Sequence, residues 1–265
     1  MGATFAPDRR PVPRAAHRRV IVVGGGCYGH YYLRQLGRAA RAGALGVEEV
    51  VVVDRDPACR VMRDPPPEAA ALPWCLSVGE WRPWFARTFA EHADTAASDA
   101  IVPSPLMPHL FFEWLLDRAT ARWPTRSVAL APVPTPPDEI PWQRAAPDGR
   151  HYVSYATWMC PVNCIEPAKC PHTRDVRDWS LPVTIERWRD ARAQEGDAFA
   201  GVITFHCTHR THGVGMVDVA ALQSADRLIA GAGERSAGVF LVGTLSHCHG
   251  ALAALSVGEP QRAAR

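Results

Sequence analysis

Residues 20–29 read VIVVGGGCYG, and this stretch decides how the N-terminal part of the chain folds. A short run of β-branched residues passes directly into glycines, which is typical of a buried strand followed by a tight turn. Gly24, Gly26 and Gly29 fit the spacing G-x-G-x-x-G. In this pattern the first glycine makes the turn, the second lets the backbone approach a phosphate, and the third lets a helix pack on the strand.

The next elements extend the pattern. Residues 28–42 are predicted to form a helix, and residues 50–54 read VVVVD, a buried strand that ends in Asp54. This order of strand, glycine turn, helix, strand and acid resembles the Rossmann family of NAD(P)-binding domains. The resemblance covers the N-terminal part only, and it implies NAD or NADP bound at the three glycines and Asp54. An S-adenosylmethionine site and a scaffold with an empty pocket remain alternatives, because both use similar elements.

Further elements complete this predicted unit. We expect helices over residues 80–92 and 110–121, and strands over residues 100–104 and 127–131. Ser104 lies at the end of one of these strands, and ligands of parallel α/β sheets bind at the carboxyl ends of strands. Ser104 is therefore a candidate cofactor contact. The prolines at 132, 134, 136 and 137 end the unit, so a nucleotide-binding domain is predicted for residues 18–137.

Three cysteines, Cys160, Cys164 and Cys170, follow within eleven residues of a proline-containing stretch. Proline excludes a regular helix or central strand there, so the thiols lie on a loop. With His172 they supply the ligand types of an iron–sulfur cluster or a zinc site. The Cys-Pro pairs resemble those of ferredoxins, but the spacing matches no ferredoxin pattern. We predict a cysteine-rich metal-binding insert over residues 138–180, with an iron–sulfur cluster first, zinc as the alternative, and three free thiols as the third possibility.

The C-terminal part, residues 181–265, contains a helix predicted over residues 185–194 and then a duplication. Segments 201–213 and 238–250 each read as an apolar strand, a turn with cysteine and histidine, and His-Gly. Each is expected to continue into a helix, over residues 217–230 and 251–257. Two such parallel βα units place both turns at one edge of the sheet.

That edge carries most of the candidate catalytic residues. We expect His209, His212 and His249 to transfer protons. Arg210 suits a carboxylate or phosphate of a substrate. Cys207 or Cys248 is the candidate fourth ligand of the metal centre.

These observations predict an α/β protein with a Rossmann-like parallel sheet, a cysteine-rich insert and two C-terminal βα units, preceded by a disordered lead-in over residues 1–17. The expected function is an NAD(P)-binding oxidoreductase with a metal centre on Cys160, Cys164 and Cys170. The alternative is a nucleotide- and redox-responsive metal-binding sensor, or a metal-delivery protein, without turnover. The two differ in whether NAD(P)H is consumed.

Composition narrows the expected partners. A net charge of +2 over 265 residues gives no reason to expect a nucleic acid. No apolar run reaches the roughly 18 residues of a membrane span, so we expect no membrane partner and a cytoplasmic location. The expected partners are a small-molecule substrate, an electron-transfer protein for the cluster, and a second copy of the chain in a homodimer.

Overall fold

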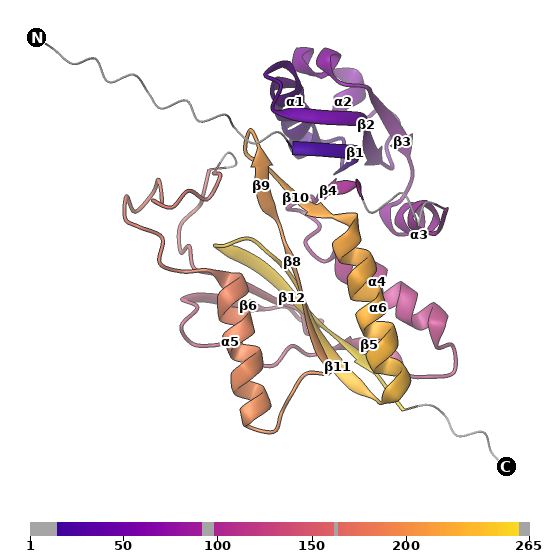
Figure 1. The fold of residues 1–265 in the computed structure, drawn as a ribbon, viewed down its shortest axis with the longest axis vertical. Coiled ribbons are helices and arrows are strands. Elements are labelled where there is room, and N and C mark those ends of the chain that lie inside the picture. Colours follow the sequence, from indigo (N-terminus) through magenta and orange to yellow (C-terminus); the bar gives the residue numbers. More distant parts are fainter. Residues whose placement is uncertain (1–14, 92–97, 162–163, 260–265) are drawn as a thin grey trace, which may run out of the picture.

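The structure of the protein, a computed structural model, describes residues 15–91, 98–161 and 164–259. Helices and strands are mixed along the chain, and the strands form two separate mixed sheets (Figure 1). The fold is therefore a mixed α/β fold. Of the lead-in predicted for residues 1–17, residues 1–14 lie outside the described residues, and residues 15–17 belong to the first strand.

The first sheet has a parallel part and an antiparallel edge. In spatial order its strands are β3 (Trp74–Val78), β2 (Leu45–Asp54), β1 (Ala15–Val23), β4 (Ala100–Val102), β10 (Val214–Asp218) and β9 (Thr208–Thr211). The first four run parallel to one another. β10 is antiparallel to β4, and β9 is antiparallel to β10. A C-terminal hairpin thus extends a sheet built by the N-terminal residues.

The apolar run of β1 is buried on both faces of this sheet. Val20 and Val22 belong to the core cluster of α1 (Cys27–Arg41), whereas Ile21 and Val23 belong to the cluster of α4 (Leu110–Arg122) and α6 (Val219–Arg235). The alternation follows the two-residue period of a strand. Continuous apolar residues are required here because helices cover both faces. Between β2 and β3 lie α2 (Arg60–Arg63) and the 3-10 helix η1 (Pro67–Ala71).

The second sheet is mostly antiparallel. In spatial order it contains β6 (Trp142–Ala145), β7 (His151–Ser154), β12 (His249–Val257), β11 (Gly238–Leu245) and β8 (Gly201–His206), with β5 (Val128–Ala131) paired to the second half of β12. β8 and β11 are parallel, and the other neighbours are antiparallel. The helix α5 (Leu181–Gln194) covers one face through Leu181 and Ile185. α4 and α6 share a core cluster with strands of both sheets, so they join the two sheets.

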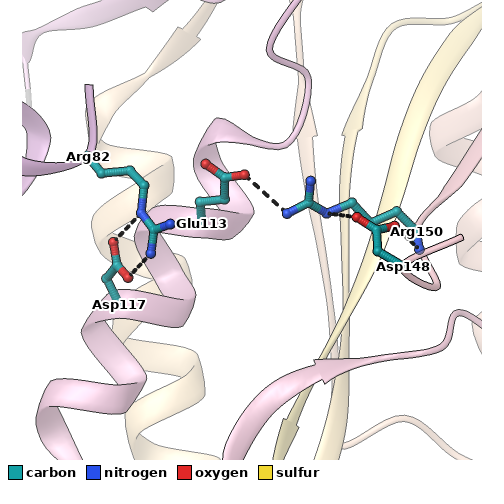
Figure 2. Close-up of polar contacts among 5 residues, drawn as sticks. All are labelled: Arg82, Glu113, Asp117, Asp148 and Arg150. Carbon is teal, nitrogen blue, oxygen red and sulfur yellow. Dashed lines mark hydrogen bonds and ion pairs between the residues drawn. The ribbon is translucent and has the colours of Figure 1, made fainter. Parts of the chain in front are cut away.

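Ion pairs join α4 to two neighbouring elements, α3 and the β6–β7 turn. Arg82 of α3 (Trp81–Glu91) donates two hydrogen bonds to the carboxylate of Asp117 in α4, with Nε 2.8 Å from Oδ2 (Figure 2). Arg150, in the β6–β7 turn, donates to Glu113 Oε1 of α4 at 3.1 Å, and its Nε lies 3.5 Å from Asp148 Oδ2. Partly exposed pairs add little stability in water. These pairs nevertheless place both α3 and the β6–β7 turn beside the same helix, α4.

Five predicted helices are confirmed to within a few residues. Residues 28–42, 80–92, 110–121, 185–194 and 217–230 correspond to α1, α3, α4, α5 and α6. Each follows a local apolar pattern, which is the strongest secondary-structure signal in a sequence. No helix in the described part of the chain is long and apolar enough to cross a membrane.

The prediction of a second C-terminal βα unit is wrong. Residues 251–257, expected as a helix, belong to β12, which runs antiparallel to β11. Alanine favours a helix, but Ala251–Leu255 are buried between paired strands and helices, and tertiary burial overrides propensity. The first unit is also interrupted, because the β9–β10 hairpin separates β8 from α6.

Strand pairing connects the predicted domains. β5 lies before the boundary expected at residue 137, yet it pairs with β12 of the second sheet. β10 lies in the C-terminal part, yet it pairs with β4 of the first sheet. Each sheet therefore contains strands from both sides of the boundary predicted at residue 137.

The glycine turn provides a stability test. A Cβ on Gly29 would lie 1.7 Å from the backbone oxygen of Gly24, whereas a Cβ on Gly26 would meet nothing within 4 Å. We expect Gly29→Ala to lower the free energy of unfolding by about 2–4 kcal/mol, because backbone must move, and Gly26→Ala to change it by less than about 0.5 kcal/mol. Urea unfolding followed by circular dichroism measures both. Equal stability of the two variants would contradict this packing.

Candidate functional site

The turn after β1 leaves space beside the first residues of α1. Gly24 has φ +94°, a left-handed conformation that glycine adopts without strain. The N-cap of α1 is Gly26, which has no side chain to satisfy the first N–H groups of the helix. These groups are positioned to bind an anion, and the helix dipole favours one there.

A cleft of about 450 Å³ lies at this helix end. It is lined by Gly26, Gly29, Asp54 and Ser104, and by Arg55, which follows Asp54 in the chain. Tyr28, Glu80, Trp81 and Met107, which the sequence did not single out as cofactor contacts, also line it. The carboxylate of Asp54 accepts hydrogen bonds from the N–H of Gly25 at 2.7 Å and the N–H of Asp56 at 2.9 Å. The structure thus brings together the five predicted cofactor residues, with Gly24 in the turn itself.

A second pocket, of about 720 Å³, adjoins the cleft. Segment 104–108 borders both spaces, because Ser104, Leu106 and Met107 line the cleft whereas Pro105 and Pro108 line the second pocket. We call the second pocket the histidine pocket, because His249 lies in its wall. One short segment therefore contributes to the walls of both spaces.

One face of three strands forms the wall of the histidine pocket. Trp142 of β6 and His249 of β12 both pair with Ser154 of β7. In the next row, Arg144 of β6 and Ala251 of β12 both pair with Tyr152. Residues two apart in a strand share a face, so both rows face the pocket that they line.

Hydrogen bonds define the tautomer of His249. The Ser154 hydroxyl donates to the carbonyl oxygen of Ala156 at 2.7 Å, so it accepts from Nδ1 of His249 at 2.9 Å. Nδ1 therefore carries the proton, and Nε2 of the neutral ring keeps its lone pair. Burial lowers the pKa of His249, with Glu166 acting in the opposite direction. The ring is consequently neutral at pH 7 and can accept a proton at Nε2.

Glu166 organises the turn that precedes β12. Its carboxylate accepts from the Ser246 hydroxyl at 2.6 Å, the His247 N–H at 2.9 Å and the Cys248 N–H at 3.2 Å. Burial alone would raise the pKa of Glu166, but the bonds from Ser246 and His247 outweigh burial and hold this pKa below its usual value. Glu166 has φ +49°, so the loop holds a strained residue to make this contact.

Three further histidines lie around Glu166. The rings of His206 and His247 are 4.7 Å apart at their centroids, and Nδ1 of His247 lies 3.0 Å from the Ser180 hydroxyl. Burial, and then the neighbouring His247, lowers the pKa of His206. Burial also lowers the pKa of His209, while Glu166 raises it. The prediction that the ends of β8 and β11 share one edge is therefore correct, since Leu245 pairs with His206.

A third pocket lies on the other side of this turn. It has a volume of about 580 Å³ and is lined by His247, Arg177 and the stacked rings of Tyr155 and Trp179, with the acids Glu139 and Asp178. The guanidinium of Arg177 is already hydrogen-bonded to the loop, because it donates to the carbonyl oxygen of Pro167 at 2.9 Å and to that of Glu166. The turn 246–249 therefore separates two pockets, with His247 toward one and His249 toward the other.

The predicted metal ligands of the cysteine loop have partners of their own. Cys164 Sγ accepts the N–H of Glu166 at 3.4 Å, and backbone hydrogen bonds from Thr173 and His172 lower the pKa of Cys170. Burial, and then the thiols of Cys164 and Cys170, raises the pKa of Cys160. Residues 162–163 of this loop lie outside the described residues.

The remaining proposed ligands are dispersed. His172 is exposed and stacks on Trp158 with ring centroids 4.7 Å apart. Burial raises the pKa of Cys207 and of Cys248 to about 12, and Cys248 Sγ accepts from Trp179 Nε1 at 3.2 Å. Within residues 15–91, 98–161 and 164–259, no three Cys, His, Asp or Glu side chains are arranged to hold one metal ion.

Two candidate catalytic residues lie apart from His249. His212 is at the exposed tip of the β9–β10 hairpin, where its carbonyl oxygen accepts from Gln35 Nε2 of α1 at 3.0 Å. Arg210 pairs with Asp218 across the same hairpin, with Nη2 2.8 Å from Oδ2. The hairpin carries both residues to the edge of the first sheet, so neither lines the histidine pocket.

Comparison with known proteins places the C-terminal part in a family. A family model described as "Uncharacterized protein, C-terminal domain" matches residues 111–258, which is more than half of the chain. The chain therefore belongs to this family. No curated protein and no solved structure matches this chain. The match begins within α4 and ends after β12, so it includes the second sheet, the β9–β10 hairpin and the histidine pocket wall, whereas the glycine turn lies before it.

The contacts of Glu166 predict a pH-dependent contribution to stability. We expect Glu166→Gln to lower the free energy of unfolding at pH 7 by about 1–3 kcal/mol, because an ionised acceptor of three donors is lost. A carboxylate whose pKa is lowered by folding stabilises the protein above its unfolded pKa of about 4.3, and this contribution disappears as pH falls through the folded value. The two proteins should therefore converge below about pH 4.

Urea unfolding of both proteins between pH 7 and acid pH measures this difference. Glu186→Gln, on the exposed face of α5, is the matched control and should change stability by less than about 0.5 kcal/mol. If Glu166→Gln is as stable as the original protein at pH 7, the carboxylate does not fix the turn.

Proposed function

We propose that this member of the family is an NAD(P)-dependent oxidoreductase that binds the nucleotide in the glycine-turn cleft and the substrate in the histidine pocket. One observation carries the proposal: segment 104–108 lines both the cleft at α1 and the pocket that contains the free Nε2 of His249. An enzyme that moves a hydride needs adjoining sites for nucleotide and substrate, with a proton donor or acceptor beside the substrate.

The cleft has the features of a dinucleotide site. The parallel strand order β3-β2-β1-β4 resembles the first four strands of the Rossmann order 3-2-1-4-5-6, and the cleft lies at the carboxyl ends of these strands. Open space at Gly26 leaves room for a pyrophosphate against the N-terminus of α1. Asp54, at the end of β2, would accept a hydrogen bond from a ribose hydroxyl.

The histidine pocket supplies the proton chemistry. When bound, NAD(P) accepts or donates a hydride. As a hydride leaves a substrate alcohol carbon, Nε2 of His249 takes the hydroxyl proton, and the alcohol becomes a carbonyl. In reduction the protonated ring returns the proton to oxygen while carbon receives the hydride. Ser154 holds the ring in the required tautomer. Neutral His249 at pH 7 favours the proton-accepting direction.

Nucleotide binding tests the proposal. Gly26→Ala places a methyl group where the pyrophosphate would lie, so we expect its affinity for NADH and NADPH to fall at least tenfold while the protein stays folded. Gly231→Ala in α6, where the nearest atom to an added Cβ is 3.8 Å away, is the matched control and should bind like the original protein. Fluorescence titration with each nucleotide measures the affinities. If the original protein binds neither nucleotide, the proposal is wrong.

The alternative function, a nucleotide- and redox-responsive metal-binding sensor or metal-delivery protein, depends on the cysteine loop. The backbone donors to Cys170 favour it, because such donors stabilise a thiolate and thiolates bind metals. Iron–sulfur and zinc both remain candidates for this loop. The oxidoreductase proposed above does not depend on a metal, and consumption of NAD(P)H would distinguish it from a sensor.

Metal analysis tests the cysteine loop. We expect protein purified without oxygen to contain iron with sulfide, or zinc, and Cys164→Ala to lose most of that metal. Cys75→Ala, which removes an exposed thiol in β3, should retain the metal and serves as the control. Elemental analysis together with absorbance near 400 nm, roughly where iron–sulfur charge transfer lies, measures both. Equal metal content in the two variants would contradict a ligand role for Cys164.

A further inference from the structure

We infer that the substrate of the histidine pocket is an anion with an apolar body, and that Arg144 recognises its negative group. This inference rests on the proposed function and specifies its substrate class. It follows from the charges of the pocket, the position of Arg144 and the apolar side chains between Arg144 and His249.

The charges that line the three pockets differ. In the nucleotide cleft Asp54 and Glu80 accompany Arg55, and in the third pocket Glu139 and Asp178 accompany Arg177 and Arg187. The described residues that line the histidine pocket include Arg144 and His249 but no aspartate or glutamate. A pocket with one fixed positive charge and no acid favours an anionic ligand, because opposite charges attract more strongly where water is partly excluded.

Arg144 has no acid partner among the described residues, which is unusual in this hairpin. Its neighbour Arg150 is held by Glu113 and Asp148 (Figure 2). Arg144 instead extends from β6 at the exposed rim of the pocket, opposite Tyr152. An unpaired guanidinium offers a planar set of donors that matches a carboxylate with two parallel hydrogen bonds.

Apolar side chains line the space between the two polar ends. Trp142 and Tyr152 contribute rings to the wall, and Tyr152 lies on β7, between β6 and β12. Arg144 in β6 and His249 in β12 are separated by two strand spacings across the sheet and two residues along it, or roughly 12 Å between backbones. The substrate therefore carries its anionic group several bonds away from the carbon that reacts near His249. Its apolar part lies between them, as is common in small-molecule pockets of this size.

The test compares a carboxylate with its neutral amide. The probes are 3-phenylpropanoate and 3-phenylpropanamide, titrated by calorimetry with and without the NADH or NADPH that the protein binds. We expect the original protein to bind the carboxylate at least tenfold more tightly than the amide. In Arg144→Ala this preference should fall below twofold, and Arg144→Lys should retain part of it. Arg227→Ala, an exposed arginine of α6, should behave like the original protein.

The outcomes separate the two proposals. Equal affinity for the two probes in the original protein, or a preference that survives Arg144→Ala, overturns the role of Arg144. If neither NADH nor NADPH binds, the proposal of an oxidoreductase is wrong. The affinities of the carboxylate and the amide measured without nucleotide still show whether Arg144 binds the anionic group. Circular dichroism checks that each variant is folded, and unchanged nucleotide affinity in Arg144→Ala separates a pocket effect from a general loss of structure.

Discussion

The close approach of Gly29 to the backbone oxygen of Gly24 is the constraint on which the proposed site depends. Because no Cβ intervenes, α1 begins directly at the end of β1, and its first N–H groups face the cleft. Asp54 reinforces this arrangement, since its carboxylate accepts the N–H of Gly25 from the neighbouring strand end. A longer connection would place the helix end away from β2 and β4, and the cleft would not have these residues in its wall.

A second constraint acts at the other sheet. The turn 246–249 must place His249 against Ser154, and Glu166 holds that turn through three donors. The ion pairs of Arg82 and Arg150 then hold α3 and the β6–β7 turn on α4 (Figure 2). Since α3 begins at the cleft and the β6–β7 turn borders the histidine pocket, α4 contacts elements of both sites.

The parts that sequence predicted are those encoded locally. Val20–Val23, the three glycines and Asp54 form one short pattern, so their place at one cleft followed from strand and helix periods. Residues 251–257 were missed because their alanines favour a helix in isolation, and only pairing with distant β11 and β5 makes them a strand. His212 was misplaced because the His-Gly repeat gives no sign that a hairpin carries it to the other sheet. The contacts of Glu166 and the row that contains Arg144 could not be predicted from sequence, since both include residues about 80 or more positions away.

Hydrogen exchange with and without NADPH and NADH tests most directly whether a nucleotide occupies the cleft at α1. If it does, the backbone amides of residues 24–30 and of Ser104, Leu106 and Met107 should exchange more slowly when the nucleotide is added, because these residues form the glycine turn and the wall of the cleft. Residues 168–177 of the cysteine loop should exchange at an unchanged rate. Protection confined to that loop, with none at residues 24–30, would show that the nucleotide does not bind at α1.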